Sequence, residues 1–122
     1  MRAPSSDLPL VLTEVSLQAG ATTILDRVSL TIAPGAPPLI VGPNGAGKTS
    51  LLRLCMGLEM PSSGRVTWGG RENGAMTRRA MLFQRPVLLR RSAAANIDYA
   101  LAQAGTPRPQ RAPRGGALLE RV

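Results

Sequence analysis

The sequence predicts a mixed α/β fold, and three observations support that prediction. Segments near the N-terminus alternate apolar and polar residues, which is typical of strands with one buried face. A glycine-rich stretch, residues 42–50, follows the short apolar run at 39–41. Behind it, residues 51–58 carry apolar side chains at helical spacing. Strands and helices in this order indicate a mixed α/β fold, and a chain of 122 residues is one domain at most.

Two strands are predicted before the glycine-rich stretch. Leu8 to Val15 alternates loosely, and a turn is expected around residues 19–21. The second strand is predicted from Thr23 to Ile32. Its side chains expected on one side are Ile24, Val28, Leu30 and Ile32. A turn rich in proline and glycine, residues 33–38, then leads into a buried strand at Leu39 to Val41.

The stretch from Gly42 to Ser50 fits the pattern G-x-x-x-x-G-K-[ST]. Glycines allow successive backbone N–H groups to curl around an anion, and the start of the next helix adds unpaired N–H groups and a positive dipole end. Lys48 is the single lysine of the chain and can reach the β- and γ-phosphates, while Thr49 offers a hydroxyl to Mg²⁺. The pattern therefore predicts a site for a nucleoside triphosphate. Its predicted residues are Gly42, Pro43, Asn44, Gly45, Ala46, Gly47, Lys48, Thr49 and Ser50.

The helix that starts at Lys48 is expected to end near Glu59. Its expected apolar stripe consists of Leu51, Leu52, Leu54, Cys55 and Leu58. After a tight turn at residues 60–64, Arg65 to Trp68 reads as a short strand with Val66 and Trp68 facing inward.

A polar turn at residues 72–74 precedes Ala80 to Phe83, an apolar run suited to a central strand. A helix capped by Ser92 is predicted to reach Ala104. Residues 105–116 are rich in Pro, Gly and Arg and predict a loop, before a further helix begins at residues 117–122.

Composition excludes several classes of protein. The formal charge is +8, but the arginines are scattered and no aromatic residues stand among them as a stacking platform for nucleic acid would require. We therefore expect no nucleic-acid partner. No apolar run approaches the ~18 residues that span a bilayer, and no secretory signal is recognisable. The chain is thus expected in the cytosol, with Cys55 as a core residue.

Five segments together resemble the nucleotide-binding subunit of ATP-binding-cassette (ABC) transporters. The phosphate-loop segment has the form G-P-N-G-A-G-K-[ST]-[ST]-L, and a segment resembling the family's Q-loop follows at the usual distance downstream. The matching segments are Ile24 to Leu30, Val41 to Leu58, Pro61 to Trp68, Met81 to Leu89 and Ala94 to Ile97. The phosphate loop alone suits many nucleotidases, so the second site makes the resemblance specific.

The resemblance implies a partial P-loop NTPase cassette: an antiparallel β subdomain with the start of a parallel core and of a helical subdomain. Residues 1–122 would be the N-terminal part of an ATP-binding domain, divided into 1–91 and an incomplete helical subdomain at 92–122. The cofactors implied are ATP and Mg²⁺. Lys48 and Gln84 would act in catalysis, and Thr49 and Gln84 would approach the metal.

The resemblance also implies partners. Arg85 to Ser92 would contact a membrane permease subunit, which fits the apolar run 87–89 between arginines, and a second ATP-binding subunit would complete a dimer. The chain would then lie at the cytoplasmic face of the membrane. The text from Phe83 to Ser92 is similar to cassettes of small-oxyanion importers, tungstate in particular.

Two departures from the family pattern matter. The residue at the usual position of the adenine-stacking aromatic is Ala19. The signature L-S-G-G-Q, the Walker B aspartate with its glutamate, and the switch histidine do not occur in the 122 residues. We therefore predict that this chain alone does not hydrolyse ATP appreciably. Two alternatives stay open: a cytosolic cassette ATPase without a transporter, and a non-catalytic nucleotide-binding fragment.

Overall fold

The structure is a computed structural model that describes residues 6–72 and 79–122. The chain forms two compact units, Met1–Met81 and Leu82–Val122, and each is described here by itself. The division falls ten residues before the expected boundary at 91/92. The assignment of residues 1–91 and 92–122 to two subdomains stays a prediction. The turn predicted at 72–74 lies largely outside the described residues.

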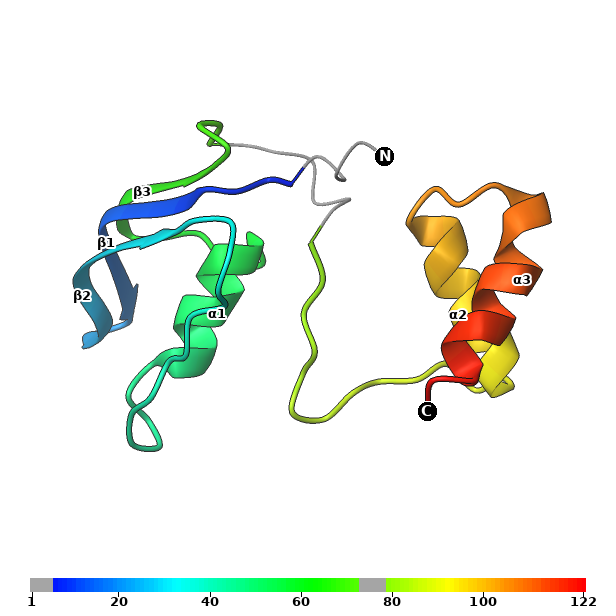
Figure 1. The fold of residues 1–122 in the computed structure, drawn as a ribbon. Helices are drawn as coiled ribbons and strands as arrows, with labels where there is room; N and C mark the ends of the chain where they lie inside the picture. Colours follow the sequence, from blue (N-terminus) through cyan, green and yellow to red (C-terminus); the bar gives the residue numbers. More distant parts are fainter. Residues whose placement is uncertain (1–5, 73–78) are drawn as a thin grey trace. The chain divides into compact units, whose positions relative to one another are not determined.

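The first unit contains a three-stranded antiparallel sheet with the strand order β2-β1-β3 (Figure 1). Its strands are β1 (Leu10–Ala19), β2 (Thr22–Ile32) and β3 (Ser63–Trp68). The predictions for β2 and β3 are confirmed, including the inward side chains of Val66 and Trp68. The first strand begins and ends later in the sequence than predicted, because it continues to the tight turn at Gly20 and Ala21.

Three register shifts interrupt the pairing of β1 with β2: two bulges, one on each strand, and a further shift between Leu17 and Gln18. The pairing steps from Leu12↔Leu30 to Val15↔Val28 and then to Leu17↔Leu25, so each strand in turn contributes one extra residue. Each extra residue reverses the alternation of side chains. The prediction for β2 is right at Ile24, Val28, Leu30 and Ile32, which are partly buried against the core, but it missed Leu25, which is buried next to Ile24.

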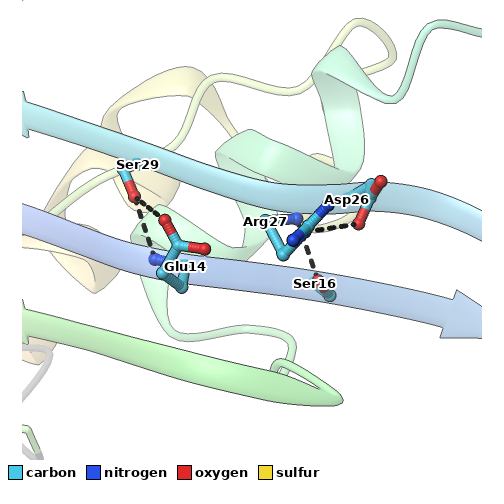
Figure 2. A network of polar contacts seen from close by, with 5 residues as sticks. All are labelled: Glu14, Ser16, Asp26, Arg27 and Ser29. Carbon is cyan, nitrogen blue, oxygen red and sulfur yellow. Dashed lines mark hydrogen bonds and ion pairs between the residues drawn. The ribbon is translucent and has the colours of Figure 1, made fainter.

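Serine hydroxyls hold both bulges (Figure 2). Glu14 and Arg27 have positive φ angles of 49° and 46°, which are uncommon for residues other than glycine. The N–H of Glu14 donates to Ser29 Oγ at 3.0 Å, and the N–H of Arg27 donates to Ser16 Oγ at 2.9 Å. The Ser29 hydroxyl also donates to the Glu14 carboxylate at 3.2 Å. Each bulge thus recovers, from a serine on the opposite strand, a hydrogen bond for a displaced backbone N–H.

Helix α1 (Lys48–Met56) packs on the sheet and completes the core. Leu54 and Cys55 are buried against Leu12 and Val15, as the apolar stripe predicted. Leu52 and Leu58 are exposed, contrary to the prediction: Leu52 lies about 100° around the helix from Leu51, and Leu58 lies beyond its end. Trp68 Nε1 donates to the carbonyl of Cys55 at 2.7 Å and so ties β3 to the C-terminal turn of α1. The remaining core residues are Leu10, Leu17, Leu25 and Val66.

Among the described residues, the start of a parallel core is not observed. Residues 39–41 and 80–83 are not strands, and Leu39 and Val41 are 87% and 83% exposed. A strand exists only when its N–H and C=O groups are paired along a neighbour. Among residues 6–72 and 79–122 neither segment has such a neighbour, because the sheet consists of β1, β2 and β3. Their apolar composition alone was therefore an insufficient signal.

The second unit is a pair of helices, α2 (Ala93–Gln103) and α3 (Arg108–Leu119). The predicted cap is confirmed, since Ser92 Oγ accepts from the N–H of Ala95 at 3.2 Å. The loop predicted at 105–116 and the helix predicted at 117–122 are wrong, because α3 occupies most of the former and ends at Leu119.

Helix α3 forms in spite of its prolines and glycines. Pro109 stands in the first turn, where its missing N–H is not needed, although Pro113 lies inside the helix. A Cβ placed on Gly115 would be 3.5 Å from Ile97 Cγ2, so the two helices pack closely there. Arg111 Nε donates to the carbonyl of Thr106 at 2.8 Å across the connecting turn. Tertiary packing therefore overrides local propensity.

Candidate functional site

The glycine-rich stretch predicted to bind phosphate forms a closed loop before α1. Lys48 Nζ donates to the carbonyl oxygens of Gly42 and Pro43, the latter at 2.7 Å. The N–H of Ala46 donates to Pro43 O at 3.2 Å. The lysine side chain is therefore folded over its own loop, and its ammonium stands among backbone oxygens that a phosphate group could replace as partners.

Gly47 connects this loop to the sheet. It is the N-cap of α1, with a φ angle of 91°. A Cβ at this position would lie 3.0 Å from the carbonyl oxygen of Ile24 and 3.1 Å from Leu25 Cδ2. Only glycine meets both demands, a left-handed backbone and close contact with β2. The loop therefore packs against β2, the strand whose bulge directs the Leu25 side chain toward the core.

The N-terminus of α1 is open to an anion. Its N-cap offers no side-chain hydrogen bond, and its first turn contains no acidic residue. The first N–H groups of a helix lack intrahelical partners, and the helix dipole adds positive potential at this end. Thr49 is exposed in the first turn, next to Lys48. Backbone donors, one ammonium and one hydroxyl therefore gather within three successive residues, which is suitable chemistry for a phosphate with its Mg²⁺.

Gln84 and the segment Arg85–Ser92, which we name the docking segment, belong to the second unit. Gln84 is exposed. Val87 and Leu88 are 93% and 74% exposed, so the apolar run does not enter the core. Asn96 of α2 makes several hydrogen bonds to this segment, a feature that the sequence pattern alone did not reveal.

Comparison with known families identifies the class of this loop and its surroundings. The profile of the ABC transporter family matches residues 25–114, which is most of the chain. The chain belongs to the ABC transporter family. The resemblance drawn from the phosphate loop and the Q-loop text is therefore confirmed, and this ABC chain carries both segments inside the matched region.

Curated relatives of this ABC chain are ATP-binding proteins of import systems. The zinc import protein ZnuC of Roseobacter denitrificans is 47% identical over 75% of this chain and 39% of its own length. The taurine import protein TauB of Chromobacterium violaceum is 40% identical, over 84% and 40% of the two chains. The tungstate uptake protein TupC of Peptoclostridium acidaminophilum is 43% identical, over 71% and 41%. The chain thus spans about two fifths of the length of these relatives.

A solved structure supports the fold. The ATP-binding subunit of an ABC transporter superposes with a TM-score of 0.74 at 24% identity, covering 84% of this chain and 45% of that one. The agreement concerns the fold alone. Within residues 6–72 and 79–122, neither α1, α2 nor α3 is long and apolar enough to cross a bilayer.

Proposed function

We propose that this chain binds Mg²⁺ with ATP at Gly42–Ser50 and acts within an ABC importer, energising uptake of a small solute. The observation that carries the proposal is the seated loop, in which Lys48 reaches over carbonyls of its own loop in front of an uncapped helix. When bound, Mg²⁺ would neutralise phosphate charge. Thr49 would supply a hydroxyl ligand, and Lys48 would orient the terminal phosphates. Gln84 is proposed to approach the metal and the attacking water.

The permease is the proposed partner of the docking segment. Val87 and Leu88 expose apolar surface between the charged side chains of Arg85, Arg90 and Arg91. Contact of this surface with an amphipathic segment of another protein would be more favourable than its exposure to water. The relatives are named as ATP-binding proteins of import or uptake systems, which supports a transporter rather than a cytosolic cassette ATPase. This role places the chain at the cytoplasmic face of a membrane, with a second ATP-binding subunit as a further partner.

We propose only the chemical class of the transported solute. The relatives import zinc, taurine, tungstate, aliphatic sulfonates and methionine. The text of residues 83–92 favours a small oxyanion such as tungstate. The competing function is a nucleotide-binding fragment that occupies a permease without turnover, and it shares both proposed surfaces.

Calorimetric titration with Mg²⁺ and ATP tests the nucleotide site. Replacing Lys48 by alanine removes a charge-assisted hydrogen bond worth about 1.5–3 kcal/mol, so affinity should fall at least about tenfold. Lys48→Arg should lose less, because the charge remains although its planar fork fits the loop poorly. Arg53→Ala is the matched control: it removes one positive charge from the last turn of the same helix and should leave affinity unchanged. Equal affinity for Lys48→Ala and the natural chain would refute the site.

Crosslinking tests the docking segment. Single cysteines at Val87, Leu88 or Leu89 should crosslink to a membrane protein in vesicles from the producing cells, and a cysteine at the exposed Ser63 of β3 should not. Cys55 is buried and adds little background. If Ser63→Cys labels the membrane protein as strongly as Leu88→Cys, the docking assignment is wrong.

A further inference from the structure

One side chain of α2 holds the end of the docking segment. Asn96 Oδ1 accepts from the N–H of Leu89 at 2.9 Å, and Asn96 Nδ2 donates back to the Leu89 carbonyl at 3.1 Å. The same Nδ2 lies 3.2 Å from the carbonyl of Arg91 and 3.0 Å from that of Ser92. The amide thus pairs with Leu89 as a neighbouring strand would, and it also gathers the two carbonyls that lead into the helix.

These contacts point away from a role in the helix itself. Asparagine is a weak helix former, whereas the three residues before it in α2 are alanines. The backbone N–H of Asn96 already makes its helical bond to Ser92 O at 3.0 Å. The hydrogen bonds of its side chain, in contrast, reach residues at or before the N-cap. Asn96 therefore lowers the intrinsic stability of α2 while fixing the backbone that precedes it.

We infer that Asn96 is the positioning residue of the docking segment, an inference that rests on the proposed function of that segment. With the backbone of Leu89 fixed at both its N–H and its C=O, the preceding residues cannot collapse freely onto α2. Val87 and Leu88 are left exposed beside Arg90 and Arg91. The partner committed to here is a permease segment with apolar side chains and acidic neighbours, which matches this apolar and basic surface.

Two substitutions remove the contacts without weakening the helix. Asn96→Ala deletes all of the side-chain bonds and introduces a better helix former. Asn96→Asp keeps an acceptor of the same shape and places a negative charge near the helix N-terminus, which favours the helix. It nevertheless turns a donor facing three carbonyl oxygens into a carboxylate that they repel. Gln103→Ala is the matched control, since it removes an exposed amide side chain from the last residue of the same helix and leaves the contacts of Asn96 in place.

The experiment measures three quantities on the full chain: hydrogen exchange of the Leu89 amide, crosslinking of Val87→Cys to membrane protein in vesicles, and affinity for Mg²⁺ with ATP. We expect Asn96→Ala to speed Leu89 exchange and to lower crosslinking, each at least about tenfold, with nucleotide affinity and helicity unchanged. Asn96→Asp should lower crosslinking similarly, and Gln103→Ala should preserve both Leu89 exchange and crosslinking.

Failure of this inference is distinguishable from failure of the docking proposal. If Val87→Cys labels the membrane protein in the otherwise natural chain and equally in Asn96→Ala, docking stands and the positioning role is refuted. Unchanged Leu89 exchange in Asn96→Ala also refutes it. If Val87→Cys and Ser63→Cys label alike before Asn96 is altered, the docking proposal fails and the inference fails with it.

Discussion

Gly64 stands where β3 passes closest to the bulge of β1. Its φ angle is +85°, and a Cβ at this position would lie 2.3 Å from the carbonyl oxygen of Glu14 and 2.6 Å from the Cα of Val15. Both atoms belong to the backbone of β1, so neither can move aside as the end of a flexible side chain would. The substitution Gly64→Ala therefore forces β3 away from β1 or distorts the bulge.

The expected cost has two parts that a second glycine separates. A left-handed backbone costs a residue other than glycine about 1–2 kcal/mol, and overpacking of a well-packed site costs about 1–3 kcal/mol. Gly70 has a φ angle of +80° and no atom within 4 Å of its would-be Cβ. Gly70→Ala therefore carries the backbone cost alone, and Gly64→Ala should be less stable than Gly70→Ala by about 1–3 kcal/mol.

Urea unfolding followed by the fluorescence of Trp68 measures this difference. Trp68 is the single tryptophan, and it links β3 to α1 through its bond to the Cys55 carbonyl. With a slope of about 1 kcal/mol per molar urea for so small a unit, the midpoint of Gly64→Ala should lie about 1–3 M below that of Gly70→Ala. Coincident midpoints would show that β3 has room at this point, and the argument from the close approach would be refuted.

Three further predictions concern the site and the core. Because Ala19 cannot stack on a base, ATP and GTP should bind within about tenfold of each other, or 1.4 kcal/mol, by calorimetry; a larger preference would reveal another base contact. Purified residues 1–122 should show no steady ATP hydrolysis that Lys48→Ala abolishes, because no general base for water accompanies the phosphate loop in this sequence. Burial raises the pKa of the Cys55 thiol above its ordinary value of 9.0. The folded state therefore keeps the proton longer than the unfolded state, so stability should fall as pH rises through about 9 in the natural chain but not in Cys55→Ala.

The phosphate loop was predictable because its signal is chemical and local. Gly47, Lys48 and Thr49 must stand at fixed positions whatever the rest of the chain does, and a pattern of residue types records that demand. The strands β2 and β3 were also predictable, because the alternation of apolar and polar residues that marks a half-buried strand is visible in the local sequence. Alternation did not predict the burial of Leu25, because the bulge at Asp26 and Arg27 shifts the phase and a bulge depends on the partner strand.

The errors share one physical cause. Residues 39–41 and 80–83 have strand-like composition, but a strand forms only with a neighbour, and composition does not report pairing. Helix α3 shows the converse, because its Pro-rich text adopts a helix through packing of Gly115 against Ile97. Asn96 was visible as part of a family-like segment, yet its contacts with Leu89 depend on how the chain turns at Ser92.

The bulge on β2 links the packing of the hydrophobic core to the position of the phosphate loop. Without the extra residue on β2, the alternation set by Val28, Leu30 and Ile32 would turn Leu25 outward. The bulge instead brings Leu25 into the core, where its Cδ2 lies within 3.1 Å of the place a Cβ on Gly47 would take. Gly47 in turn begins α1 and fixes where Lys48 leaves the loop. The hydrogen bond from Arg27 N–H to Ser16 therefore supports the geometry of the phosphate loop although neither residue belongs to the motif. For this reason the motif alone does not specify how the loop packs against the sheet.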